Sequence, residues 1–394
     1  MMLLESQIAL LEALKASLFC ITPSYPFEVD WDEVIKEANA QTVTGLISSV
    51  IPVRDEMNEQ CKAAYIRFMY EQDRLLSLFY EANIPYVIIK GAAAAVYYSK
   101  PYLRSMGDID ILVSRGCFVK SVELLESNGY ICVDGKDEEG NIPDDVRELT
   151  YFKNGIEVDL HHHFSSFGYN MDDILERAID RRVCRTLNGH SFYMLPFCEN
   201  GLVLLGHINQ HLQNNLLGLR QIIDWEMYLS SVDDRAAWEN QFTPVAEQIG
   251  LLKLASYVTK MCIDHLGLQG SFEMCNGIND DYSDELLEII LTDGNFGRRM
   301  NPAQQREEKV ARGALYDIRR YGFFSYFQGV GLRTWSLCKK YPILKPVAFI
   351  YGIGRLSIRF VKALFSNKCL LKEMNEAQKR YGLYQRIGVR QGVK

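Results

Sequence analysis

Hydrophobic periodicity changes abruptly at Pro85, and few folds accommodate such a change. Before this proline, apolar residues recur at helical spacing over residues 3–14, 31–50 and 54–82. Asn83-Ile84-Pro85 ends the third segment, because proline has no N–H to donate to a continuing helix. Short apolar runs typical of buried strands follow it. We therefore expect an N-terminal helical segment and, after it, a core that contains a β-sheet.

Five strand-like runs alternate with two helical segments, a loop and a turn after the proline. The expected strands are residues 86–89, 108–113, 130–133, 148–152 and 156–161, and the expected helices are residues 92–98 and 118–127. Asn154-Gly155 joins the last two strands and is the strongest short signal for a tight hairpin. This order predicts an α+β fold in which an α/β-type core carries a mixed sheet.

The chain returns to helical patterns beyond residue 165, apart from a small hairpin around Asn188-Gly189. The expected helices are residues 171–182, 198–213, 217–230, 245–266, 284–292 and 302–321, with a further apolar segment over 347–365. We therefore divide the chain into four parts: an N-terminal helical segment (1–83), an α/β core (84–165), a helical domain (166–308) and a basic helical C-terminal region (309–394).

The net charge of −7 is unevenly distributed along the chain. Residues 309–394 carry 18 Lys and Arg against 3 Asp and Glu, a net of +15, whereas residues 1–308 carry 25 against 47, a net of −22. The acidic balance of the whole chain gives no reason to expect a general nucleic-acid binder. Three interpretations of the basic region stay open: ordinary packing, contact with an anionic membrane surface, or contact with RNA or another polyanion.

We expect a cytoplasmic protein without a transmembrane segment. The ten cysteines form no C-x-x-C pair, which is typical of reduced, packed thiols. The N-terminus lacks the basic residues of a signal peptide, and no stretch approaches the ~18 uninterrupted apolar residues of a spanning helix. The motifs of α/β-hydrolases, Rossmann dinucleotide-binding proteins and P-loop proteins are absent from the sequence.

Asp108-Ile109-Asp110 is the sharpest chemical feature of the sequence. Residues i and i+2 of a strand project from the same face, so the two carboxylates lie ~6–7 Å apart and repel each other unless a cation lies between them. Mg²⁺ prefers carboxylate oxygens together with substrate phosphates. The pair predicts a divalent-metal site, and neutralising either carboxylate should leave the fold intact or stabilise it. The alternative is a capped or solvated strand end.

Two more motifs point the same way. Lys90-Gly91 ends one strand and begins a helix, and N–H groups at a helix N-terminus favour anions. Glu157-Val158-Asp159 lies on an alternating strand that directs Asp159 and His161 to one face. A third carboxylate beside the first two would complete the acidic triad of a two-metal phosphoryl-transfer site. The alternative for Asp159 is an exposed hairpin carboxylate.

These motifs together resemble a known family. They are Ile89-Lys90-Gly91-Ala92, the run Arg104-Ser105-Met106-Gly107-Asp108-Ile109-Asp110, and Glu157-Val158-Asp159-Leu160-His161. In order and spacing they resemble the nucleotidyltransferases of the DNA polymerase β-type superfamily, and within it the bacterial uncharacterised nucleotidyltransferase family. The motifs cover about residues 85–164. Residues 204–224, with His207, His211, Arg220 and Asp224, are similar to a histidine-rich helix and an arginine-aspartate helix of that family. The resemblance implies the nucleotidyltransferase fold with a helical C-terminal half.

The resemblance also implies an activity. It would be an Mg²⁺-dependent transfer of a nucleoside monophosphate from a nucleoside triphosphate, with ATP favoured, to a hydroxyl acceptor at a two-metal site. Asp108, Asp110 and Asp159 would hold the metals, and Asp159 would help to activate the attacking hydroxyl. The phosphates would be bound by Lys90, Gly91, Ala92 and Arg104. The acceptor, whether a sugar, antibiotic, protein or RNA end, stays open.

The chain departs from the superfamily pattern at the phosphate loop. Gly91-Ala92 stands where Gly-Gly or Gly-Ser is usual, so a serine hydroxyl to phosphate is missing. Lys90 and Arg104 are cations that would compensate, although Lys90 also suits an exposed strand end and Arg104 a structural pair with Asp108. The missing serine keeps a second hypothesis open, a catalytically weak nucleotide-binding or regulatory protein that keeps the fold.

The histidines support the site rather than form one of their own. Alternation along the strand sends His162 to the opposite face from His161 and His163, so the three cannot easily chelate one ion. We expect His161 to orient the carboxylate of Asp159 as a supporting residue that does not bind the ion itself. His207 and His211 share a helical face but lack the glutamate of a metalloprotease motif, which favours a packing or cleft role over a metal site.

Overall fold

The computed structural model describes residues 3–52, 54–137, 139–143, 146–164, 171–214, 216–297, 322–335, 341–354 and 370–389. Contacts divide the chain into two units, residues 1–298 with 387–394, and residues 299–386. Each unit is described by itself. The four-part division made from the sequence stays a prediction.

The first unit is built on a seven-stranded mixed sheet with the order β3-β4-β5-β2-β1-β7-β6. The strands are β1 (Tyr86–Ile89), β2 (Asp108–Val113), β3 (Ile131–Asp134), β4 (Glu148–Lys153), β5 (Ile156–His161), β6 (Val183–Leu187) and β7 (His190–Met194). The pairs β2–β5 and β1–β7 are parallel, and the other pairs are antiparallel. The predicted α+β fold with a mixed sheet is confirmed.

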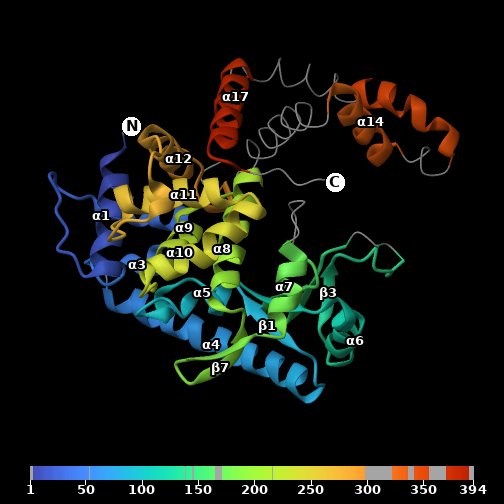
Figure 1. The fold of residues 1–394 in the computed structure, drawn as a ribbon, viewed down its shortest axis with the longest axis horizontal. Coiled ribbons are helices and arrows are strands. Elements are labelled where there is room, and N and C mark those ends of the chain that lie inside the picture. The colour runs from blue at the N-terminus through green and yellow to red at the C-terminus, as the bar shows by residue number, and fades with distance from the viewer. Residues whose placement is uncertain are drawn as a thin grey trace. The chain divides into compact units, whose positions relative to one another are not determined.

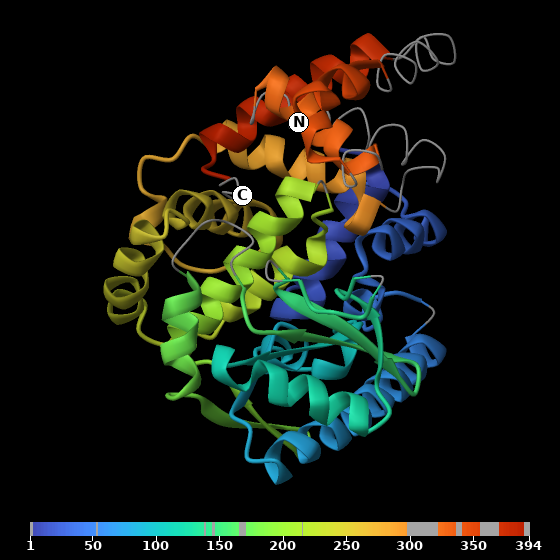
Figure 2. The ribbon, with the colours of Figure 1, turned by 90° about the vertical axis from the view of Figure 1, so that its right-hand side faces the viewer.

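Two helices cover one face of this sheet. The apolar residues of α4 (Arg54–Glu81) and α6 (Phe118–Ser127) share a core with inward-facing residues of the strands, among them Ile109, Ile111 and Val158. Figures 1 and 2 show α4 and α6 below the sheet and the yellow-green helices above it. Because side chains alternate along a strand, Asp108, Asp110 and Asp159 lie on the face away from α4 and α6.

Trp225 packs with its aromatic neighbours Tyr228, Trp238 and Phe242 in a separate cluster. The unit has further described helices besides α4 and α6. They are α1 (Glu5–Phe19), α2 (Trp31–Gln41), α3 (Thr44–Ile47), α5 (Gly91–Ala95), α7 (Met171–Ile179), α8 (Phe197–Asn214), α9 (Leu219–Ser230), α10 (Arg235–Gln248), α11 (Leu252–Met261) and α12 (Asp280–Asp293). Helices α8 and α9 pack together, and α9 also contacts α5 beside the sheet.

Two expected helices are each divided by a residue with positive φ. The helix predicted over 31–50 ends at Gln41, because Thr42 adopts a φ of 59° and the chain restarts at α3. The helix predicted over 245–266 is wrong in a similar way, since Gly250 has a φ of 74° and separates α10 from α11. Periodicity continued across both breaks, so it could not reveal them.

The second unit contains α14 (Phe323–Thr334), a short helical segment from Pro342 and α17 (Leu370–Arg386). Gly331 and Gly352 permit a close crossing here, because a Cβ on Gly331 would lie 1.9 Å from the Ala348 carbonyl oxygen. The helix predicted over 302–321 lies outside the described residues, and so does most of the segment predicted over 347–365. Among the described helices, none combines the length and apolarity that a membrane span requires.

Candidate active site

Strand register brings the predicted carboxylates together. In the parallel pair β2–β5, Asp110 lies opposite Asp159, and in the antiparallel pair β4–β5 Asp159 lies opposite Thr150. Neighbouring strands are only ~4.8 Å apart, so these side chains form one row across three strands. The Thr150 hydroxyl donates a hydrogen bond to Asp159 Oδ1 over 2.7 Å.

Asp110 is the best-paired carboxylate of the row. It is 2% exposed, and its Oδ1 accepts hydrogen bonds from Lys90 Nζ at 2.6 Å and from His161 Nε2 at 3.0 Å. Burial raises the pKa of Asp110, but Lys90 and His161 outweigh burial and hold the pKa at about 2. The pKa of Lys90 is raised, because Asp110 and Asp108 more than offset its burial. Lys90 is therefore not the exposed strand-end residue that the sequence left open.

His161 links Asp110 to a second acid. Its other ring nitrogen, Nδ1, lies 2.9 Å from Glu148 Oε2. Burial lowers the pKa of His161, yet the hydrogen bonds to Asp110 and Glu148 raise it to about 9. Near neutral pH the ring therefore carries a proton on both nitrogens and donates to both carboxylates. The same contact lowers the pKa of Glu148.

Asp108 and Asp159 are short of positive charge. The neighbouring Asp110 and burial raise the pKa of Asp108, with Lys90 and Arg220 opposing the rise. Burial and Asp110 raise the pKa of Asp159 to about 6. Excess negative charge on carboxylate oxygens is the chemistry that a hard divalent cation satisfies.

One set of side chains in the described part of the chain could hold such an ion. Asp110, Asp159 and His161 each offer a ligand atom, and these atoms all lie within 4.8 Å of one another. Asp108 shares the face of Asp110 but is not part of this compact group. Because its two carboxylate neighbours keep His161 protonated, the carboxylates are the better metal ligands, and they fit Mg²⁺.

The strand-to-helix turn beside the carboxylates has an unusual backbone. Lys90 has a φ of 54°, a conformation that side chains other than glycine rarely adopt, and Gly91 follows with a φ of 29°. Such conformations cost free energy and persist where the surrounding structure enforces them. Here the turn directs the Lys90 ammonium onto Asp110. Ala92, which follows in the five-residue helix α5, is fully buried.

Arg104 lies in a buried network with α9. Its Nε and Nη2 donate to the two oxygens of Asp224, each over 2.7 Å, and the Tyr98 hydroxyl donates to the same carboxylate. Arg104 is 5% exposed and Asp224 3% exposed. The structural partner of Arg104 is thus Asp224 and not Asp108, and the role of Arg104 in phosphate binding stays a prediction.

Helices α8 and α9 carry a second group of polar residues near the carboxylates. The His211 Nδ1–H donates to the Leu216 carbonyl at 3.2 Å, so His211 Nε2 accepts from His207 Nε2–H at 2.7 Å. Burial lowers the pKa of both rings, that of His211 to about 4, so the pair is neutral. The two histidines form a hydrogen-bonded pair with each other. Arg220, in the first turn of α9, rests over the Phe296 ring at 5.8 Å from its centroid.

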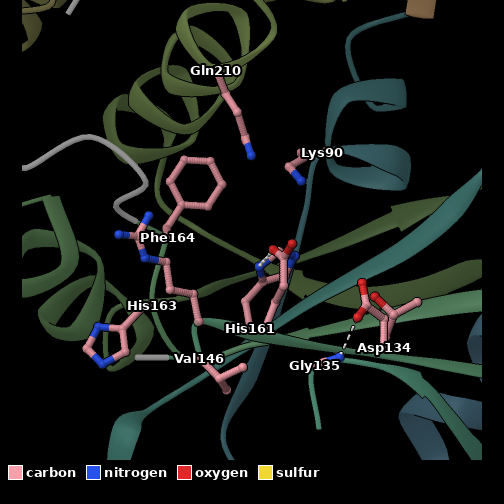
Figure 3. A pocket seen from close by; sticks show the side chains of 11 residues that line it. Lys90, Asp134, Gly135, Val146, His161, His163, Phe164 and Gln210 are labelled. Atoms are coloured by element: carbon pink, nitrogen blue, oxygen red, sulfur yellow. Dashed lines mark hydrogen bonds and ion pairs between the residues drawn. The ribbon is translucent and has the colours of Figure 1, made fainter. Parts of the chain in front are cut away.

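A cavity of about 380 Å³ opens beside Thr150, Glu148 and His161. Figure 3 shows Lys90 and Gln210 pointing toward it, with the Phe164 ring on the other side of Gln210 from Lys90. The Lys90 ammonium lies 5.8 Å from the centre of the Phe164 ring. This cavity therefore lies on the β4–β5 side of the carboxylates.

Sequence reasoning missed Glu148 and Thr150, although a signal for both was present. A two-residue hairpin at Asn154-Gly155 pairs residue 153 with 156, and counting outward pairs Thr150 with Asp159 and Glu148 with His161. The contact between Arg104 and Asp224 had no such signal, because 120 residues separate them.

Comparison with known proteins gives a family match and distant structural neighbours. A family model described as uncharacterised nucleotidyltransferase matches residues 28–267, more than half of the chain. Among solved structures, ANT(2″)-Ia in complex with adenylyl-2″-tobramycin is 11% identical with a TM-score of 0.32, over 46% of this chain and 98% of that one. An antigenic nucleotidyltransferase-like protein from Paracoccidioides brasiliensis is 16% identical with a TM-score of 0.29, over 48% of this chain and 90% of that one.

Both TM-scores are too low for either neighbour to bear on the substrate, and no curated protein is similar enough to count as a relative. The family match stands on its own, because it spans the sheet, its carboxylates and the helices α8 and α9. The chain belongs to the uncharacterised nucleotidyltransferase family.

Proposed function

We propose that this protein transfers a nucleoside monophosphate from a nucleoside triphosphate, with ATP favoured, to a hydroxyl acceptor. The observation that carries the proposal is the row of carboxylates on one sheet face, with Asp110 directly beside Asp159 and Asp108 two residues away on the same strand. Such a row has little structural purpose without a cation, because like charges oppose one another.

In this proposal Asp108, Asp110 and Asp159 hold Mg²⁺. The metal, when bound, neutralises charge on the phosphates during in-line displacement. The acceptor oxygen forms a bond to the α-phosphorus, the bond from that phosphorus to the bridging oxygen breaks, and pyrophosphate leaves. The hydroxyl proton passes to the Asp159 carboxylate, which accepts a hydrogen bond from the cavity-lining residue Thr150. Lys90 and His161 orient Asp110 through their hydrogen bonds to its Oδ1 atom.

Pyrophosphate release in the presence of Mg²⁺ tests the proposal. The parent protein, given ATP and a panel of sugar, nucleic-acid and protein hydroxyl acceptors, should release pyrophosphate, and Asp159→Asn should reduce the rate by at least about 100-fold. Calorimetry with ATP and the other triphosphates, with and without Mg²⁺, measures the binding step separately.

The second hypothesis, a catalytically weak nucleotide-binding or regulatory protein, predicts a different result. It requires Mg²⁺-ATP binding of ordinary affinity, no pyrophosphate release with any acceptor, and no further effect of Asp159→Asn. Absence of binding to every triphosphate would contradict both hypotheses.

A further inference from the structure

Arg220 is a half-buried cation that has no ion-pair partner among the residues that the structure describes. Its Nε is enclosed without a hydrogen-bond partner, and within the described ranges its guanidinium forms no ion pair. The two terminal Nη atoms are not enclosed in this way, so this end of the guanidinium reaches open space. A guanidinium without protein partners in a partly buried position is costly unless a ligand supplies the missing acceptors.

The location of Arg220 also disfavours a structural role. It occupies the first turn of the twelve-residue helix α9, where the helix dipole is positive and a cation weakens the helix. Arg104 lies nearby and, together with burial, lowers the pKa of Arg220. Two arginines and the positive end of a helix therefore converge on one place, and of these two arginines Arg104 is the one with a carboxylate partner, Asp224, among the described residues.

Contacts with Phe296 hold the guanidinium in place. The Arg220 guanidinium lies 5.8 Å from the centre of the Phe296 ring. The His211 ring contacts the same phenyl ring edge-on, with 5.4 Å between the two ring centres. Because His211 is neutral, it packs against Phe296 without adding a second positive charge near Arg220. In the part of the chain that the structure describes, Arg220 is thus held by ring contacts and not by hydrogen bonds, which leaves its donors available.

The helix of Arg220 reaches the sheet through α5, which contacts β1 and β2, whereas Asp159 belongs to the next strand, β5. The electrostatic influence of Arg220 reaches Asp108, whereas the partners of Asp159 are Asp110, Thr150 and His161. In an in-line displacement, the attacking and leaving oxygens lie on opposite sides of the phosphorus. If the acceptor enters from the side of Asp159, pyrophosphate leaves on the side of Arg220.

We infer that Arg220 binds the β- and γ-phosphates of the nucleoside triphosphate and stabilises the departing pyrophosphate. The inference rests on the proposed function. It assigns a phosphate-binding group that would replace the serine hydroxyl missing from the loop, since Ala92 has no hydroxyl and the five-residue α5 is too short to supply a strong dipole. A planar guanidinium suits this ligand, because it donates two parallel hydrogen bonds to phosphate oxygens.

Calorimetry with inorganic pyrophosphate, Mg²⁺-ATP and AMP tests the inference on the full chain. Arg220→Gln should weaken pyrophosphate and Mg²⁺-ATP by roughly 10- to 100-fold, the loss expected for charge-assisted hydrogen bonds, and leave AMP unchanged. Arg74→Gln removes the same charge from an exposed position on α4 and should change none of the three affinities. Circular dichroism confirms that both variants are folded.

Arg220→Lys provides a second test that keeps the charge. A lysine cannot donate two parallel hydrogen bonds, so pyrophosphate affinity should fall several-fold, less than in Arg220→Gln. Should Arg220→Gln fail to fold, this variant decides alone. Parental affinity for pyrophosphate in the folded variants overturns the inference, while Mg²⁺-ATP binding by the parent keeps the proposed function intact. A parent protein that binds neither pyrophosphate nor any triphosphate overturns both.

Discussion

At the residue scale, Asp108 and Asp110 are chemically different although two positions apart on one strand. Asp110 has a lysine and a protonated histidine against its carboxylate, and its pKa is lowered. Asp108 has mainly the charge of Asp110 as a neighbour, and its pKa is raised. The sequence predicts that neutralising either residue is harmless or stabilising, and the contacts in the structure lead us to expect this only for Asp108.

Thermal melts without metal should separate the two aspartates. Asp108→Asn removes a repulsion and should raise stability by on the order of 1 kcal/mol. Asp110→Asn leaves Lys90 and His161 without their counter-charge and should lower stability by about 3–5 kcal/mol. Asp180→Asn, at an exposed position after α7, is the matched control and should change little. Shifts of the same sign and size in the two site variants would contradict this account.

Glu226 presents a different residue-scale problem, a buried acid without a use in the proposed mechanism. It is 0% exposed, and neither carboxyl oxygen has a hydrogen-bond partner of normal geometry. Burial raises the pKa of Glu226 well above its usual value, and neither the Leu268 amide nor Lys15 offsets this. Folding therefore requires the neutral acid.

The stability of the protein should depend on pH through this group. A raised folded-state pKa means that the stability contributed by Glu226 is complete below its unfolded pKa of ~4.3 and is lost as the pH rises toward the folded value. Glu226→Gln has no proton to lose, so its gain over the parent should be small at pH 5 and about 1–3 kcal/mol at pH 8. Urea unfolding at the two pH values measures this gain. A gain that does not change with pH would show that Glu226 is not the titrating group.

At the element scale, the Arg104–Asp224 pair fastens α9 to the loop before β2. Since Arg220 is one helical turn from Asp224, the same pair sets where the Arg220 guanidinium lies. Breaking a buried ion pair leaves a charge uncompensated, so Arg104→Gln should cost about 3–5 kcal/mol of stability.

A double-mutant cycle checks that this cost belongs to the pair. Asp224→Asn combined with Arg104→Gln should be clearly less destabilising than the sum of the single variants, because the second change removes the orphaned charge. Tyr98→Phe removes only one neutral donor and should cost about 1 kcal/mol. Strict additivity in the cycle would mean that the two residues stabilise the protein independently.

At the scale of the whole molecule, ligand binding should be visible as stability. A ligand that binds only the folded state at 100 times its Kd stabilises the protein by about 2.7 kcal/mol. Mg²⁺ with ATP should therefore raise the melting temperature, and chelation of the metal should remove most of the shift, because uncompensated carboxylates repel the phosphates. Mg²⁺ with AMP, which lacks the β- and γ-phosphates, should give a smaller shift. An equal shift from ATP with and without Mg²⁺ would argue against a metal site.

The local order of the polypeptide could be read directly from its residues. The period change at Pro85, the strand 108–113 and the hairpin at Asn154-Gly155 are consequences of short-range chemistry, in which a missing N–H, alternation and a tight turn each act over a few residues. The mixed sheet and the predicted carboxylates followed from this order. The division of two long helices did not, because Thr42 and Gly250 leave the hydrophobic period unchanged.

The charges that surround those carboxylates depend instead on distant contacts. Whether Lys90 lies on Asp110 or in solvent, whether Arg104 pairs with Asp108 or Asp224, and whether Arg220 has any partner are settled by how α5, α8 and α9 pack against the sheet. The seven-stranded width likewise arises from a parallel pairing of β7 with β1, roughly a hundred residues apart in sequence. Electrostatic energy depends on separation in space and on burial, and neither follows from the order of residues alone.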